Sequence, residues 1–93
     1  MATKQELIDA LRDAVGGTAY GDYIVSEAAE TYGDKSHKYG QGIKDRLDER
    51  IGLLKAYERI HRAAGEDAKA VAEEEKIAIS EKALAAVEKL DEE

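Results

Sequence analysis

The chain has 93 residues and contains no Cys, Trp, Phe or Pro. Its length allows one domain, and the lack of Cys excludes disulfides, thiolate zinc sites and cysteine nucleophiles. Leu, Ile and Val together number only 18, so we expect a subunit that relies on partners for stability. The net charge of −7 repels phosphate backbones, and we expect no specific nucleic-acid binding.

The charge is unevenly distributed along the chain. Residues 41–65 carry +2 and residues 66–93 carry −6. No apolar run approaches the length of about 18 residues that a membrane span needs. The first residues, Met1 to Glu6, lack the apolar segment of a signal peptide. We therefore expect no membrane contact, and a location in the cytoplasm or in a particle assembled there.

The first predicted helix covers residues 4–15. Thr3 and Glu6 have the spacing of a capping box, in which each satisfies a backbone N–H of the other. The apolar residues that follow share one stripe at helical spacing: Leu7, Ile8, Leu11, Ala14 and Val15. Gly16 and Gly17 predict its end, because glycine accepts the backbone conformations that close a helix.

Residues 17–42 allow two interpretations. One is a short helix over residues 23–32, capped by Asp22 and ended by Gly33. The other is a β-hairpin that turns at residues 32–35, because residues 23–25 have high β propensity and residues 36–39 could form the return strand. Propensity slightly favours the helix, and the sequence leaves both open.

The second predicted helix covers residues 42–64. Its apolar residues form a half-cylinder wide enough to pack on two neighbours. One side of the half-cylinder holds Ile43, Leu47, Ile51, Leu54 and His61, and the other holds Leu53, Tyr57, Ile60 and Ala64. The opposite side of the helix carries a basic stripe of Lys44, Lys55, Arg59 and Arg62.

The third predicted helix covers residues 67–90 and is acidic and rich in Ala. A seam at alternating spacings of four and three runs through Ala72, Lys76, Ile79, Ala83, Ala86 and Leu90. Its small side chains predict close contact with another helix, in the same chain or on a neighbouring subunit. The chain thus divides into a core at residues 1–65 and a C-terminal acidic helix at residues 66–93, and the expected fold class is mainly α.

The search for catalytic patterns gives a negative result. His37 and His61 lack a second ligand at metal-binding spacing, and the glycines match no phosphate-binding loop. No serine lies in a nucleophile elbow. The acidic runs, such as residues 73–75, are typical of a solvated helix face. We expect no enzymatic activity, no cofactor and no metal.

Two sets of residues are candidates for partner binding. The first is the tyrosines Tyr20, Tyr23, Tyr32 and Tyr39, which could serve as interface anchors or as the aromatic part of a small core. The second is the basic stripe of Lys44, Lys55, Arg59 and Arg62. It could dock on an acidic partner or, less favourably, on DNA phosphates. Alternatively it is a solvated helix face, or it pairs with the acidic C-terminal helix.

The order of elements resembles a known family. The chain begins with a helix at TKQELIDALRDAVGG, followed by a Tyr-rich segment at YIVSEAAETYGDKSHKYG and a helix at GIKDRLDERIGLLKAYERI. Over residues 3–62 this order is similar to that of the gpW-type head–tail joining proteins of tailed phages. The resemblance lies in the Thr3–Glu6 helix start, the turn at residues 32–36, Tyr39, and the apolar positions of the following helix. It implies two antiparallel helices with a β-hairpin between them.

The functional expectation follows from this resemblance together with the low core content. It is a structural assembly protein, a head–tail adaptor or completion subunit of the virion that contacts portal, tail or neighbouring copies in a homo-oligomeric ring. The alternative is a small acidic helical regulator or inhibitor of a host protein complex, with residues 66–93 supplying the negative surface.

Overall fold

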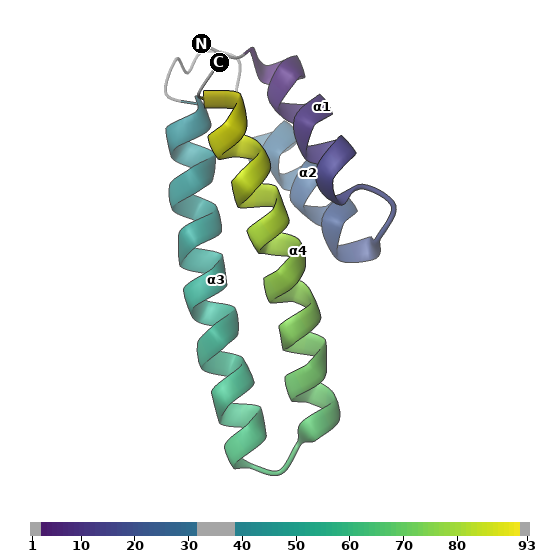
Figure 1. The fold of residues 1–93 in the computed structure, drawn as a ribbon, viewed down its shortest axis with the longest axis vertical. Coiled ribbons are helices and arrows are strands. Elements are labelled where there is room, and N and C mark those ends of the chain that lie inside the picture. Colours follow the sequence, from purple (N-terminus) through teal and green to yellow (C-terminus); the bar gives the residue numbers. More distant parts are fainter. Residues whose placement is uncertain (1–2, 32–38, 92–93) are drawn as a thin grey trace.

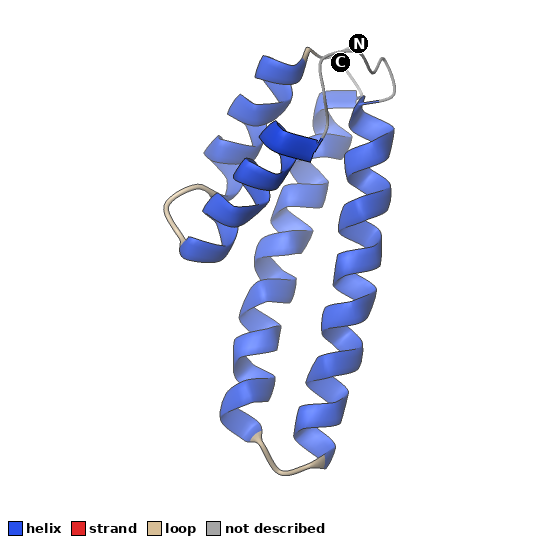
Figure 2. Ribbon diagram, turned by 180° about the vertical axis from the view of Figure 1, so that it is seen from behind, coloured by secondary structure: helices blue, strands red, loops and turns tan. Residues whose placement is uncertain are grey.

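The computed structural model describes residues 3–31 and 39–91. These residues form four helices: α1 at Lys4–Val15, α2 at Ala19–Thr31, α3 at Tyr39–Ala63 and α4 at Asp67–Asp91 (Figure 1). Among the described residues there is no strand (Figure 2). The expectation of a mainly-α fold is confirmed.

The longest feature is an antiparallel hairpin of α3 and α4 (Figure 1). The molecule measures 45 × 23 × 22 Å, and α1 and α2 pack beside only one half of this hairpin (Figures 1 and 2). We call the covered half, residues 39–50 with 79–91, the base. The other half, residues 51–78 with the connecting loop, is the tip.

Helix α1 has the bounds that its sequence predicts. The Thr3 hydroxyl accepts a hydrogen bond from the Glu6 backbone N–H at 3.1 Å, and the Glu6 carboxylate accepts one from the Thr3 N–H at 3.3 Å. The four largest members of its apolar stripe are all buried: Leu7, Ile8, Leu11 and Val15. The cap and the buried stripe therefore define the same helix, which is why the sequence pattern predicted the bounds of α1 well.

The β-hairpin interpretation is wrong for the residues that the structure describes. Residues 23–25, expected as a strand, lie inside α2. Ile24, Val25 and Ala28 are buried at helical spacing on one face of α2, so burial of that face outweighs their local β propensity. The expected turn and most of the return strand, residues 32–38, lie outside the described residues.

The helical interpretation is confirmed, but its start was misplaced. Helix α2 begins four residues earlier than predicted, because Thr18 rather than Asp22 caps it: the Thr18 hydroxyl accepts from the Gly21 N–H at 3.0 Å. The Asp22 carboxylate accepts from the Gly17 N–H at 3.1 Å and so closes the turn. Gly17 has a φ of +98°, which favours glycine.

Gly21 lets α1 and α2 approach each other closely. A Cβ placed at this position would lie 1.7 Å from the Val15 carbonyl oxygen and 2.7 Å from the Thr18 hydroxyl. No side chain fits in that space, so the tight reversal between the two helices depends on glycine.

The remaining two helices differ little from expectation. Helix α3 begins at Tyr39, three residues before the predicted start, and α4 ends one residue later than predicted. Gly65, with a φ of +78°, lies in the loop between them. The pairing of helices differs more. The gpW-type arrangement pairs the first helix with residues 42–64, whereas here α3 packs chiefly on α4, and α1 packs on α4 and α2.

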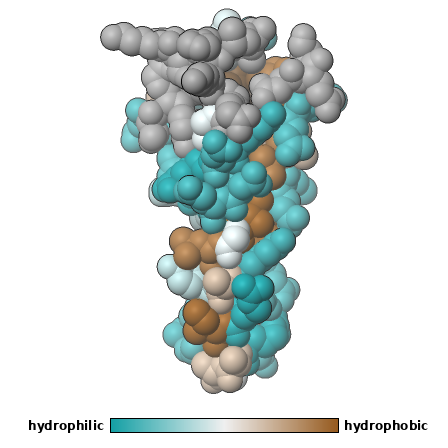
Figure 3. Space-filling view, turned by 90° about the vertical axis from the view of Figure 1, so that its left-hand side faces the viewer, coloured by the Kyte–Doolittle hydropathy of each residue, from teal (hydrophilic) through white to brown (hydrophobic). Residues whose placement is uncertain are grey.

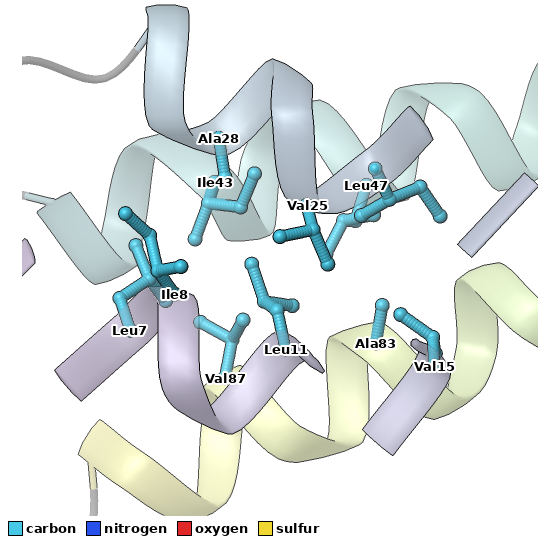
Figure 4. Packing of buried hydrophobic residues seen from close by; sticks show 11 residues of the cluster. Leu7, Ile8, Leu11, Val15, Val25, Ala28, Ile43, Leu47, Ala83 and Val87 are labelled. Carbon is cyan, nitrogen blue, oxygen red and sulfur yellow. The ribbon is translucent and has the colours of Figure 1, made fainter. Parts of the chain in front are cut away.

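The main core lies where all four helices meet, at the base (Figure 4). Helix α4 contributes Ala83 and Val87, which are fully buried against α1 and its neighbours. The core cluster consists of Leu7, Ile8, Leu11, Val15, Ile24, Val25, Ala28, Ile43, Leu47, Ala83 and Val87. The small side chains of α4 therefore serve contact within the chain at the base.

Candidate functional site

A cluster of polar and aromatic side chains joins α2 to α3 at the boundary between base and tip. Helix α2 supplies Tyr20, Tyr23 and Glu27, which share one face because they are three and four residues apart. Helix α3 supplies Arg46 and Arg50, one turn apart. We call these five residues the Tyr–Arg cluster.

Arg50 is the centre of the Tyr–Arg cluster. Its Nη2 atom donates to both carboxylate oxygens of Glu27, at 2.6 and 2.7 Å, and its Nη1 donates to the Tyr20 hydroxyl at 3.0 Å. The Tyr23 hydroxyl donates to Glu27 at 3.2 Å, and Arg46 lies 3.5 Å from the same carboxylate. The side chains of Arg50 and Glu27 are only 13% and 15% exposed, so this ion pair is largely shielded from solvent.

These contacts shift the protonation equilibria of the pair. Burial acts to raise the pKa of Glu27, but the hydrogen bonds and charge of Arg50, with Tyr23 and Arg46, outweigh it, and the pKa lies below its ordinary value. Burial acts to lower the pKa of Arg50, and its bonds to Tyr20 and Glu27 raise it overall. Both side chains are therefore charged at neutral pH, and the pair fastens α2 to α3.

An open cavity of about 470 Å³ lies beside the Tyr–Arg cluster, lined by Ala19, Tyr20, Tyr23, Arg50 and Lys76. The two tyrosine rings stack with centroids 6.0 Å apart. The Arg50 guanidinium lies 5.2 Å from the Tyr23 ring centre, and the Lys76 ammonium lies 5.7 Å from that of Tyr20. Such a surface can receive a side chain of a partner, but it holds no nucleophile with an activating base.

A second feature begins directly beyond the Tyr–Arg cluster, on the tip. At 3.6 residues per turn, six uncharged residues of α3 fall in a sector about 140° wide. We call this sector the outer face of α3; it consists of Gly52, Leu53, Ala56, Tyr57, Ile60 and Ala63. Leu53 is 53% exposed, Tyr57 44% and Ile60 61%. Figure 3 looks at the α3 side of the molecule and shows apolar side chains gathered along the tip, beside a hydrophilic flank.

The basic residues that border the outer face have different surroundings. Arg62 is paired with Glu58 at 2.7 Å and also with Glu74 of α4. Lys55 and Arg59 are exposed and make no hydrogen bond or ion pair with the described residues. Arg62 is thus paired with the acidic helix, whereas Lys55 and Arg59 are exposed, as expected of a solvated helix face.

The structure brings together some of the residues predicted for partner binding and separates others. Tyr20 packs against the core, whereas Tyr23 is 51% exposed. Tyr32 lies outside the described residues. Tyr39 is the first residue of α3, and Lys44 is half-buried near the start of the same helix.

Sequence reasoning missed Glu27, Arg50 and the exposure of the outer face. For Glu27 the signal is its position on the tyrosine face of α2, seven residues after Tyr20, which becomes visible only once that segment is read as a helix. Arg50 is 23 residues away from Glu27, and no local pattern pairs them. The outer face was predicted as apolar, and the missing information was that none of the four described helices covers it.

Among the described residues, no group of three or more His, Asp or Glu side chains could hold a metal ion. No helix in that part of the chain has the length and apolar character needed to cross a membrane. No family model matches the chain, and neither the curated proteins nor the solved structures contain one that is significantly similar to it.

Proposed function

We propose that this protein is a structural subunit without catalytic activity, which acts by binding another protein through the outer face of α3. The observation that carries this proposal is the exposure of Leu53, Tyr57 and Ile60 on a single uncharged helix face. Singly exposed apolar residues are common, but three large ones in one stripe mark an interaction surface. The open cavity at the Tyr–Arg cluster, lined by Tyr20, Tyr23 and Arg50, is a second place for a partner side chain.

The setting we propose is the assembly of a tailed phage, with the chain as a head–tail adaptor subunit between portal and tail. This setting rests on the resemblance of residues 3–62 to gpW-type proteins, from which α2 departs by being a helix. A ring of copies on the portal is part of the proposal. The competing function is that of a small acidic regulator or inhibitor of a host protein complex. In that case the partner would bind to α4 instead.

The test is a mass measurement on the purified full chain, alone and mixed with the portal and tail proteins of the same genome. We expect a complex of fixed stoichiometry with portal or tail protein. Replacing both Leu53→Glu and Ile60→Glu should abolish that complex, because two charges would then lie in an uncharged contact. Val71→Glu is the matched control, since Val71 is 47% exposed on α4, outside this face.

Two results would contradict the proposal. One is a chain that stays monomeric with every portal and tail component. The other is salt-sensitive capture of a host nucleic-acid-binding protein that survives the double substitution on α3 and is lost when the acids at residues 73–75 are neutralised. The second result would establish the competing function.

A further inference from the structure

At the tip, α3 has two neighbouring apolar sides, and α4 covers one of them; the other is the outer face. The helix is apolar over a half-cylinder, and α4 covers the side that holds Ile51 and Leu54, which are 8% and 7% exposed. The side that holds Leu53, Tyr57 and Ile60 is exposed, and none of the helices at residues 4–31 and 39–91 covers it. These three residues are spaced at i, i+4 and i+7, the spacing with which one helix contacts a single partner helix.

Gly52 adds an independent argument for a helical partner. Glycine is the least favourable residue in a helix interior after proline, yet Gly52 lies in the middle of α3. A Cβ at this position would meet no atom within 4 Å, so nothing in the described fold requires glycine there. With Ala56 and Ala63 on the same face, it leaves room for a second helix backbone to lie close to α3.

The charges at the edge of the face indicate what kind of helix fits. Lys55 and Arg59 follow one edge and have no acidic partner among the described residues. A second copy of the chain is a poor occupant. In an antiparallel two-fold contact each flank of α3 meets the same flank of the other copy, so Lys55 and Arg59 would face like charges. A partner with acidic residues along that flank would satisfy both cations.

We propose that the outer face of α3 binds an amphipathic helix of another protein, which has an apolar stripe and a row of Asp or Glu along the flank beside Lys55 and Arg59. This inference rests on the proposed function and specifies the chemistry of the partner. The apolar contacts hold the helix, and the charged flank fixes its direction and register.

The probes are two stapled, monomeric helical peptides with the same leucine stripe, one with Glu and one with Lys along the flank. Fluorescence anisotropy measures their binding to the full-length chain. We expect the acidic-flank peptide to bind at least about tenfold more tightly, with the difference shrinking as ionic strength rises from about 50 to 500 mM. Equal binding of the two peptides, or no binding of the acidic one up to about 1 mM, overturns the inference.

Three variants identify the surface that binds the peptide. The double substitution Lys55→Glu and Arg59→Glu should reverse the preference between the two peptides. Gly52→Leu should weaken both by at least about tenfold, because it fills the approach without meeting any atom of the fold. Val71→Leu on α4 should change neither. If Gly52→Leu binds as the unaltered chain does, the peptide lies elsewhere and the inference is wrong.

The inference and the proposed function fail separately. If the portal complex forms and is lost on Leu53→Glu with Ile60→Glu but is unchanged by the charge reversal at Lys55 and Arg59, the function stands and the acidic-flank partner is wrong. If the peptides discriminate as expected but no portal or tail protein binds, the surface is as inferred and the phage setting is wrong.

Discussion

The base and the tip of the α3–α4 hairpin belong to the same two helices but have different surroundings. At the base, α1 and α2 complete a core in which Leu11, Ala83 and Val87 are fully buried. At the tip, burial of hydrophobic side chains is confined to the contact between α3 and α4, at Ile51, Leu54 and Ala70 among the described residues. The comparison shows that buried apolar surface is concentrated where a second layer of helices exists, and that apolar side chains stay exposed where it does not.

The largest expected effect comes from shortening one side chain of the core at the base. Leu11→Ala removes a fully buried side chain from the main core and should lower the free energy of unfolding by about 2–5 kcal/mol. Urea denaturation followed by circular dichroism measures this change. A loss below about 1 kcal/mol would contradict the claim that the base contributes more to stability than the tip.

Two glycine substitutions should have opposite effects on the stability of the chain. Gly21→Ala should cost about 1–3 kcal/mol or more, because its Cβ would overlap the Val15 carbonyl oxygen at the turn between α1 and α2. Gly52→Ala, at the tip, should instead stabilise the chain by about 0.5–1 kcal/mol, because the position is helical and open. Thermal unfolding of both variants measures the two changes. A stabilised Gly21→Ala variant would contradict the packing described for Gly21, and a destabilised Gly52→Ala variant would contradict the open position described for Gly52.

The ion pair that fastens α2 to α3 makes a pH-dependent contribution. Because the folded-state pKa of Glu27 lies below its ordinary value of 4.5, its stabilisation is fully present above pH 4.5 and is lost as the pH falls through the lowered pKa. Glu27→Gln should therefore cost about 1–2 kcal/mol at neutral pH, and the difference from the unaltered chain should shrink in acid. Urea titrations at pH 7 and at pH values below 4.5 measure it, and a pH-independent difference would contradict the assignment.

The smallest expected effect lies on the outer face of α3. Leu53→Ser and Ile60→Ser change side chains that are already more than half exposed, so each should alter the free energy of unfolding by less than about 0.5 kcal/mol. The same denaturation measurement applies. A loss of several times that size would mean that this face is covered within the chain, and the difference between base and tip would disappear.

The helices themselves were largely predictable from local patterns. The Thr3–Glu6 capping box and the stripe from Leu7 to Val15 gave the bounds of α1, and Gly65 marked the loop before α4. The segment around Ile24 and Val25 was ambiguous because these residues favour strands locally. Its helical state follows from burial of one face against other helices, which no window of sequence contains.

The candidate site was predictable only in part. Tyr23, Lys55 and Arg59 were candidates for a binding surface and are exposed, whereas Tyr20 lies half-buried against the core. The bond between Arg50 and Glu27 joins residues that are distant in the chain, and sequence spacing has no means to pair such residues.

The sequence by itself determined that this chain is mainly helical, where α1, α3 and α4 begin and end to within a few residues, and that residues 42–64 are apolar on two sides. These properties depend on caps, glycines and periodicity, which act between neighbours a few residues apart. Only the tertiary structure decided which of the two apolar sides is covered. That outcome depends on where α1, α2 and α4 come to lie, and burial is a property of surfaces brought together from distant parts of the chain.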